Sequence, residues 1–365
     1  MTTEPTLKLR APSDLLAAIP YVVGYHPDES IVVLGMHGRR LLFSARVDLP
    51  DVSDIPIPVT VDHLLQVVRP QHCTGVFVVG FGPADRADPL LNELRRAYDE
   101  VGLWVQEVLR ADAGRYWSYV CQNITCCPPE GVAYDPVGSP LAAEWTMAGR
   151  VARRNRAEYE AQIAPVTGAA REAMTLATNA AHDGLVELLA GVADEDAADV
   201  ALLRAGSVGF ATALDLMRVG SPLADDDVAW LSVLLMDDGL RDLAWLRIVK
   251  AGADADLHRA LWMDVLRRCE PDLATAPAIL YGFAAWRCGD GGMARLAFDR
   301  ALDQDPDCGL ARRLAEALHH GVPPSAFDAL AEDLAGDTVQ PNRATKRAMS
   351  RRKRSSSGRV GSRPA

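Results

Sequence analysis

Two kinds of hydrophobic spacing alternate along the first 150 residues of the chain. Apolar residues recur every three or four positions in three segments, which predicts helices at 14–23, 61–68 and 87–101. Ser13 precedes the first segment and is expected to cap that helix. Short runs rich in β-branched and aromatic residues predict five strands, at 29–36, 41–47, 75–80, 103–110 and 115–121.

The order of these segments predicts an α/β fold for residues 1–150, in which helices pack on a mixed five-stranded sheet. Two helices each connect one strand to the next, and both crossovers are expected to join parallel strands. Ligands of open α/β sheets favour the crevice beyond the carboxyl ends of the strands. Any ligand site is therefore expected near residues 81–85, which follow the central strand.

Strand patterns are absent from residue 141 onward. A continuous helical pattern predicts one long helix at 141–163, with arginines along one side. Further helices are predicted at 169–190, 196–219, 225–238, 240–250, 255–269 and 309–319. The sequence thus predicts an all-α domain at 151–335, after the α/β domain.

Residues 275–308 match the pattern of a helical hairpin repeat of about 34 residues. The matching positions are Gly282, Ala294, Phe298, Ala301 and Pro306. The segment resembles a tetratricopeptide repeat, although alanine stands where the usual tryptophan and tyrosine occur. Because each such unit buries a face on its neighbours, the resemblance implies a tetratricopeptide-like helical array that presents a surface to a protein partner.

Charge is unevenly distributed along the chain. The formal net charge is −11, yet nine of the 38 basic residues lie within 343–363. Residues 336–365 contain few apolar side chains, which predicts a disordered basic tail. Such a tail is expected to bind polyanions weakly and in a salt-sensitive manner, while the acidic remainder of the chain opposes that binding.

Several functional classes lack their sequence signals. Every run of 18 residues carries a charge, and the N-terminus resembles no secretory signal, so we expect a cytoplasmic protein without a membrane span. Seven cysteines in this setting indicate reduced thiols. Neither a Gly-x-Gly-x-x-Gly loop, a P-loop nor a Gly-x-Ser-x-Gly elbow occurs, so no catalytic residue and no cofactor are predicted.

The segment Gly24–Ser30 reads Gly-Tyr-His-Pro-Asp-Glu-Ser and follows the first predicted helix. A left-handed cap at the glycine and the following proline would end that helix. Loops between elements are also where binding residues gather. The candidate ligand-binding residues are therefore Tyr25, His26, Ser30 and Asp85, with a purely structural turn as the alternative.

Cys121, Cys126 and Cys127 form a second motif, in a loop that continues with two prolines. Structural zinc takes four ligands, and neighbouring cysteines tend to point apart, so we expect buried thiols without a metal. A fourth ligand from a histidine or from Cys73 would permit zinc binding. A redox role and a cysteine nucleophile with His26 as base remain alternatives.

These two motifs, GYHPxxS at 24–30 and CxxxxCCPPEG at 121–131, resemble signatures of an actinobacterial family of unknown function. The resemblance covers roughly residues 7–335 and implies no activity. Three functions therefore stay open. A non-enzymatic binding or adaptor protein is favoured by the helical repeat, a small-molecule sensor or enzyme would use the α/β domain, and a nucleic-acid-associated factor would use the basic tail.

Overall fold

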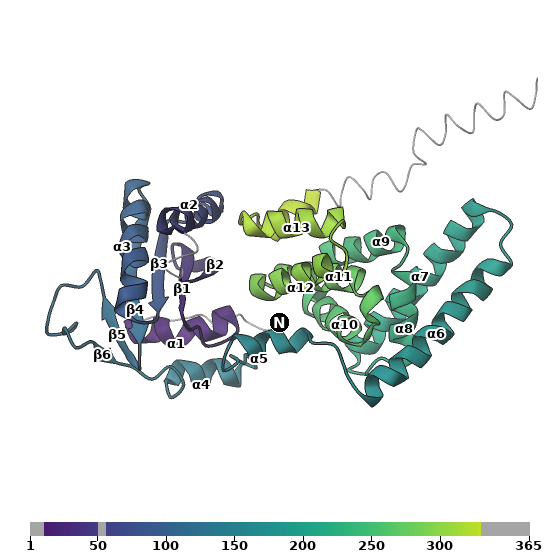
Figure 1. The fold of residues 1–365 in the computed structure, drawn as a ribbon, viewed down its shortest axis with the longest axis horizontal. Helices are drawn as coiled ribbons and strands as arrows, with labels where there is room; N and C mark the ends of the chain where they lie inside the picture. Colours follow the sequence, from purple (N-terminus) through teal and green to yellow (C-terminus); the bar gives the residue numbers. More distant parts are fainter. Residues whose placement is uncertain (1–10, 50–55, 330–365) are drawn as a thin grey trace, which may run out of the picture.

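A mixed β-sheet and an extended helical region make up the protein (Figure 1). The computed structural model describes residues 11–49 and 56–329 of the 365-residue chain. The predicted tail at 336–365 lies outside the described residues, as do the ends of the predicted domains at 1–10 and 330–335.

The sheet has six strands in the described residues, so the prediction of five was wrong. The strands run in the order β2-β1-β3-β4-β5-β6. Their bounds are β1 Ser30–His37, β2 Arg40–Asp48, β3 Gly75–Phe81, β4 Trp104–Asp112, β5 Arg115–Ser118 and β6 Val132–Ala133. The sixth strand was missed because two residues between a proline-rich loop and a turn are too short to show any alternation.

Both expected crossovers join parallel strands. β1 lies between β2 and β3 and is antiparallel to both, so β2 and β3 run in the same direction. β3 then pairs with β4 in parallel. The helix α2 (Ile57–Val68) connects β2 to β3, and α3 (Ala84–Glu100) connects β3 to β4. The sheet contains both antiparallel and parallel pairs and is therefore mixed, as predicted.

Helices cover both faces of this sheet. Along β1, Ile31 and Val33 pack towards α2 and α3, whereas Val32 and Leu34 pack towards α1 (Pro12–Val23). This alternation is the two-residue period of a strand that is buried on both faces. The expected cap of α1 was wrong: Ala11 occupies the N-cap position, and its amide donates to a carboxylate oxygen of residue 14.

The predicted long helix at 141–163 is interrupted, and this prediction was also wrong. α4 (Pro140–Met147) and α5 (Arg156–Glu160) are separated by an irregular segment. Gly149 has a left-handed φ of 80° after α4, and Asn155 caps α5 by accepting the Glu158 amide. The segment between them forms a β-bridge with the end of α1, which a continuous helix would not allow.

The remaining helices lie close to their predicted positions. They are α6 Ala169–Ala190, α7 Glu195–Arg218, α8 Asp225–Leu234, α9 Asp238–Val249, α10 Ala255–Arg268, α11 Thr275–Arg287, α12 Gly291–Gln304 and α13 Gly309–His319. From α10 to α13, consecutive helices pack side by side. α11 and α12 approach closely, since a Cβ at Gly282 would lie 2.6 Å from the Phe298 ring.

Among the described histidines of this helical core, His258 has the most strongly shifted pKa. It lies in α10 with 5% of its surface exposed, and its Nδ1 has no hydrogen-bond partner in the described part of the chain. Burial lowers its pKa to about 4, an effect larger than those of the nearby charges on Asp254, Arg247 and Arg218. The folded chain therefore holds this imidazole neutral.

We expect the free energy of unfolding to fall as the pH drops from about 6.5 to about 4. In that window the unfolded chain protonates His258 while the folded chain does not, so the loss approaches about 3 kcal/mol. Denaturant titrations at pH 7, 5 and 4 measure the free energy of unfolding at each pH. The variant His258→Leu should lack this component of the pH dependence, and an unchanged slope in that variant would contradict the assignment.

Candidate functional site

The Gly24–Ser30 motif lies where the α/β region meets the helical region. Gly24 ends α1 with a left-handed φ of 93° and donates its amide to the Pro20 carbonyl, as the sequence predicted. A Cβ at this position would lie 2.4 Å from the ring of Tyr159, a residue of α5. Glycine is thus required here both for the turn and for the close approach of that ring.

Tyr25 and His26 are joined to the segment before α5. The His26 amide donates to the Arg153 carbonyl, and the Arg153 amide donates to the Gly24 carbonyl, both at 2.9 Å. Tyr25 is 5% exposed, and its ring centroid lies 5.1 Å from that of Tyr159. Burial raises the pKa of Tyr25 and lowers that of His26. Tyr25 therefore contributes to the core of the helical region.

The other two candidates have different surroundings. Ser30 begins β1 and is fully buried, and its hydroxyl has no hydrogen-bond partner among the described residues. Asp85 is exposed in the first turn of α3. No hydrogen bond between described residues connects Asp85 with Ser30, Tyr25 or His26. The structure thus places Tyr25 and His26 beside Arg153, Ser30 in the buried start of β1, and Asp85 at the surface of α3.

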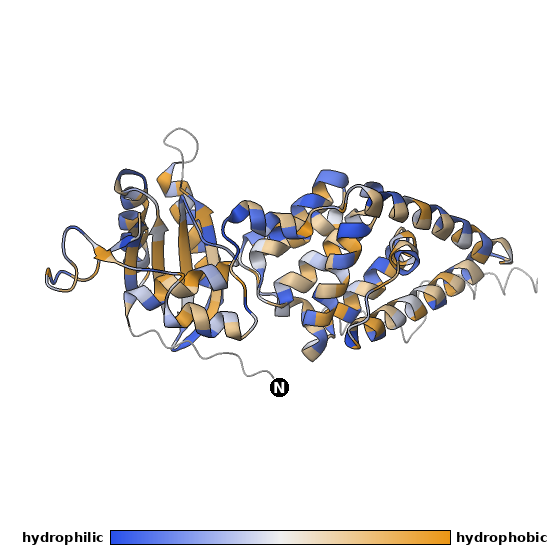
Figure 2. Cartoon of the chain, turned by 90° about the horizontal axis from the view of Figure 1, so that it is seen from below, coloured by the Kyte–Doolittle hydropathy of each residue, from blue (hydrophilic) through white to orange (hydrophobic). Residues whose placement is uncertain are grey.

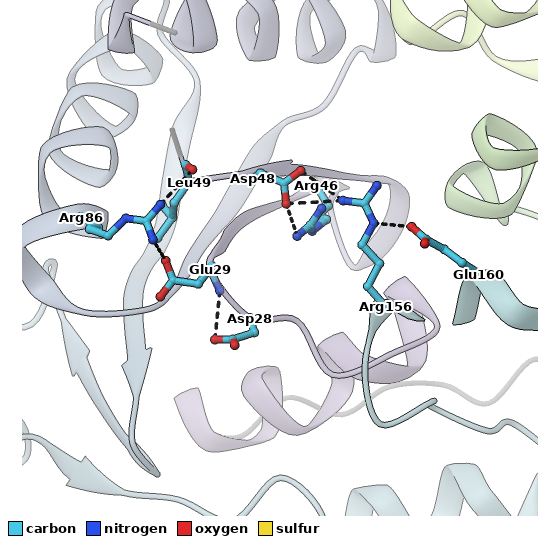
Figure 3. Close-up of polar contacts among 8 residues, drawn as sticks. All are labelled: Asp28, Glu29, Arg46, Asp48, Leu49, Arg86, Arg156 and Glu160. Atoms are coloured by element: carbon cyan, nitrogen blue, oxygen red, sulfur yellow. Dashed lines mark hydrogen bonds and ion pairs between the residues drawn. The ribbon is translucent and has the colours of Figure 1, made fainter. Parts of the chain in front are cut away.

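A charged network beside this motif was missed in the sequence (Figure 3). Arg156 of α5 reaches across to Asp48 at the end of β2, at 3.1 Å, and also bonds Glu160 at 2.6 Å. Asp48 is shared with Arg46 at 2.5 Å. The hydrogen bond to Glu160 and the nearby carboxylates raise the pKa of Arg156. These partly exposed charges pair with one another, and the pair between Arg156 and Asp48 links α5 to β2.

A second pair in the same view involves Glu29, which has an unusual left-handed φ of 43°. Its carboxylate pairs with Arg86 of α3, whose guanidinium also donates to the Leu49 carbonyl at 3.3 Å. Arg86, and not the predicted Asp85, is thus the residue of α3 that contacts the Gly24–Ser30 motif. The charge pattern Asp28-Glu29 was the only signal for this contact in the sequence.

The two regions meet again where α2 approaches α13. The imidazoles of His63 and His319 stack with centroids 4.2 Å apart, and the Gln71 side chain donates to the Gly321 carbonyl. Burial, reinforced by neighbouring histidines, lowers the pKa of His63. Contacts at both α5 and α13 therefore connect the sheet with the helices.

The cysteine loop differs from its prediction in two respects. Cys126 is exposed and Cys121 and Cys127 are only half-buried, so the prediction of buried thiols was wrong. The neighbouring cysteines do not point apart, since their Sγ atoms are 3.7 Å from each other. The Sγ atoms of Cys121 and Cys126 are 3.1 Å apart, and all three lie within 4.8 Å of one another. No other cysteine or histidine in the described residues joins this cluster.

The three thiols of the cluster differ in pKa because their hydrogen bonds and their burial differ. The Cys126 thiol, with smaller contributions from the Asn123 backbone and Cys127, lowers the pKa of Cys121. Burial and the two neighbouring sulfurs raise the pKa of Cys127 to about 12. Cys121 is thus the thiol of this group that loses its proton most easily, and the exposed Cys126 leaves the cluster accessible to solvent.

An apolar groove of about 580 Å³ lies in the helical region, between α6, α7 and α8. α6 and α7 diverge from the loop that joins them, and α8 lies between them (Figures 1 and 2). α7 is the one described helix that is long and apolar enough to cross a membrane, by length and composition alone. The groove is lined by Leu188, Ala201, Arg204, Ala205, Val208, Gly209, Thr212, Ala213, Asp227, Trp230 and Leu231.

The chain matches a known protein family. A family model described as a domain of unknown function (DUF4192) matches residues 12–325. No curated protein and no solved structure matches the chain.

Replacing Tyr159 with phenylalanine tests the junction between the two regions. Its hydroxyl donates to the Asp290 carboxylate, which also accepts the Met293 amide at the start of α12. A hydrogen bond to a charged group contributes about 1.5–3 kcal/mol, so Tyr159→Phe should lower the free energy of unfolding by about that amount.

The matched control is Tyr21→Phe, which removes a hydroxyl bonded to the Ala142 carbonyl and to a threonine hydroxyl. Because these partners are uncharged, the control should cost about 1 kcal/mol. Both variants are measured by urea unfolding followed by circular dichroism. Equal losses in the two variants would contradict a special role for the junction.

Proposed function

Because this chain belongs to the DUF4192 family, which has no assigned activity, we propose its function from its geometry: it is a protein-binding adaptor that receives an amphipathic helix of a partner protein. The observation that carries this proposal is the apolar groove between α6, α7 and α8.

The divergence of α6 from α7 leaves one face of α7 uncovered. Helices joined by so short a loop, residues 191–194, ordinarily pack against each other as antiparallel neighbours. Here Trp230 of α8 lines the groove, while Val208 of α7 has 66% of its surface exposed. Val208 therefore offers an apolar partner an exposed contact on this wall of the groove.

The shape of the groove favours a helix as its occupant. Its α7 wall runs from Ala201 to Ala213, which corresponds to about 18 Å of helix, or roughly three turns. The wall includes Ala201 and Ala205, small residues that let a second backbone approach closely. Apolar anchors at helical spacing on a partner helix are the recognised way to fill such a groove.

Two charges at the groove support an amphipathic partner. Arg204 is exposed on α7 and Asp227 is half-buried on α8. Charges of opposite sign at an apolar groove favour one orientation of a helix that carries complementary charges beside its apolar face. Asp227 already accepts the Ala224 amide at 3.1 Å, so a uniformly apolar ligand would leave Arg204 as the charge without compensation.

The other helices extend this proposal. The close approach of Gly282 to Phe298 supports the tetratricopeptide-like interpretation of 275–308, and arrays of this kind use extended surfaces for binding. We place the adaptor in the cytoplasm, in keeping with its reduced cysteines.

Photo-crosslinking from two exposed valines, one inside the groove and one outside it, tests this proposal. A photo-crosslinking amino acid is placed at Val208, in the groove, or at Val186 of α6, which is 68% exposed but does not line the groove. We expect a partner that crosslinks at Val208 and not at Val186. That partner is then identified, purified and titrated against the intact chain.

Val208→Asp should weaken binding of the purified partner by about tenfold or more, because an unpaired carboxylate would be buried in an apolar contact. Val186→Asp should leave the affinity within about twofold. Circular dichroism confirms that both variants are folded. Identical crosslinks at the two positions, or an unchanged affinity of Val208→Asp, would overturn the proposal.

A further inference from the structure

We propose that Cys121, Cys126 and Cys127 bind a thiophilic metal cation, Zn²⁺, through three thiolates, with a fourth coordination position open to solvent. The inference rests on the convergence of their three Sγ atoms within 4.8 Å. It is independent of the groove, because this loop lies at the opposite end of the molecule from α6 and α7 (Figure 1).

The separations of the sulfurs suit tetrahedral coordination. Zn–S bonds of about 2.3 Å place two thiolates of one ion about 3.8 Å apart. The Sγ atoms of Cys126 and Cys127 already have a separation of 3.7 Å, and those of Cys121 and Cys126 are at 3.1 Å. Small side-chain rotations therefore suffice to admit the ion.

The backbone of the loop holds the thiols in place before any ion binds. The Asn123 carbonyl accepts the amides of Cys126 at 3.2 Å and Cys127 at 2.8 Å. The Cys121 amide donates to the Ser118 hydroxyl at 2.9 Å. Both sides of the cluster are thus fixed by local hydrogen bonds, so little ordering is required on binding.

The second half of the loop is attached to β5. The Trp117 indole donates to the Pro129 carbonyl at 2.9 Å, and the Arg115 guanidinium donates to the Gly131 carbonyl at 2.7 Å. A Cβ at Gly131, whose φ is 78°, would lie 2.6 Å from the Trp117 ring. These contacts fix the end of the loop, after the cysteines, to β5.

The chemistry of three thiolates selects the class of ion. Sulfur ligands favour Zn²⁺ and other soft cations over Mg²⁺ or Ca²⁺. The shortage of a fourth protein ligand does not exclude zinc, because open zinc sites use three protein ligands and a water. The exposed Cys126 gives the ion a route into the cluster, and binding would release the thiol protons to solvent.

The test uses the full chain, stripped of metal and kept reduced. Zn²⁺ is titrated in competition with a chromophoric chelator, and Co²⁺ serves as a spectroscopic substitute that reports thiolate ligation. We expect one equivalent of Zn²⁺ per chain and thiolate-to-cobalt charge-transfer absorption. Cys126→Ser and Cys127→Ser should each weaken Zn²⁺ binding by about tenfold to a hundredfold or more, because losing a ligand costs at least as much as losing one of its outer-shell partners.

Cys73→Ser is the matched control, since Cys73 is a half-buried thiol outside the cluster. It should leave the affinity for Zn²⁺ unchanged. Equal losses in this control, or binding that survives in a Cys126→Ser/Cys127→Ser double variant, would overturn the proposal. So would a reduced wild-type chain that binds no Zn²⁺ but forms a Cys121–Cys126 disulfide on adding hydrogen peroxide.

Discussion

The packing of Tyr159 between the end of α1 and the start of α12 connects the two parts of this protein. Its ring lies against Gly24 on one side, and a Cβ at Gly292 would come within 2.9 Å of its hydroxyl oxygen. The hydroxyl donates to Asp290, and burial with that carboxylate nearby raises its pKa. An aromatic ring of this size fits here only because both neighbouring positions are glycine, so α5 packs closely against both parts through this side chain.

Other contacts between the regions follow from that placement. With α5 held against the end of α1, Arg156 can reach Asp48 on β2, and the β-bridge between Tyr25 and Arg153 can form. Individually, partly exposed ion pairs of this kind contribute little. Their role is to orient the sheet relative to the helices. The helices α6 and α7, which border the groove, and the cysteine loop lie at opposite ends of the molecule (Figure 1).

The sequence was most informative where structure is local. The helical spacing at 169–190 predicted α6 at its observed bounds, and the Gly24–Pro27 pattern predicted the end of α1. It was least informative for short or interrupted elements. β6 needs only two residues because β5 supplies their hydrogen bonds, and the helix break before Asn155 accommodates a bridge to a distant segment.

The amino-acid sequence by itself determined the main elements, the alternation of buried faces in the sheet and the presence of three cysteines in one loop. Only the tertiary structure decided that their sulfurs converge, that α6 and α7 diverge, and that Tyr159 meets Asp290 at a distance of 131 positions. The physical reason is that hydrophobic spacing records which side of an element faces the core. It carries no information about which other element that side meets, because every apolar face is satisfied by burial of any kind.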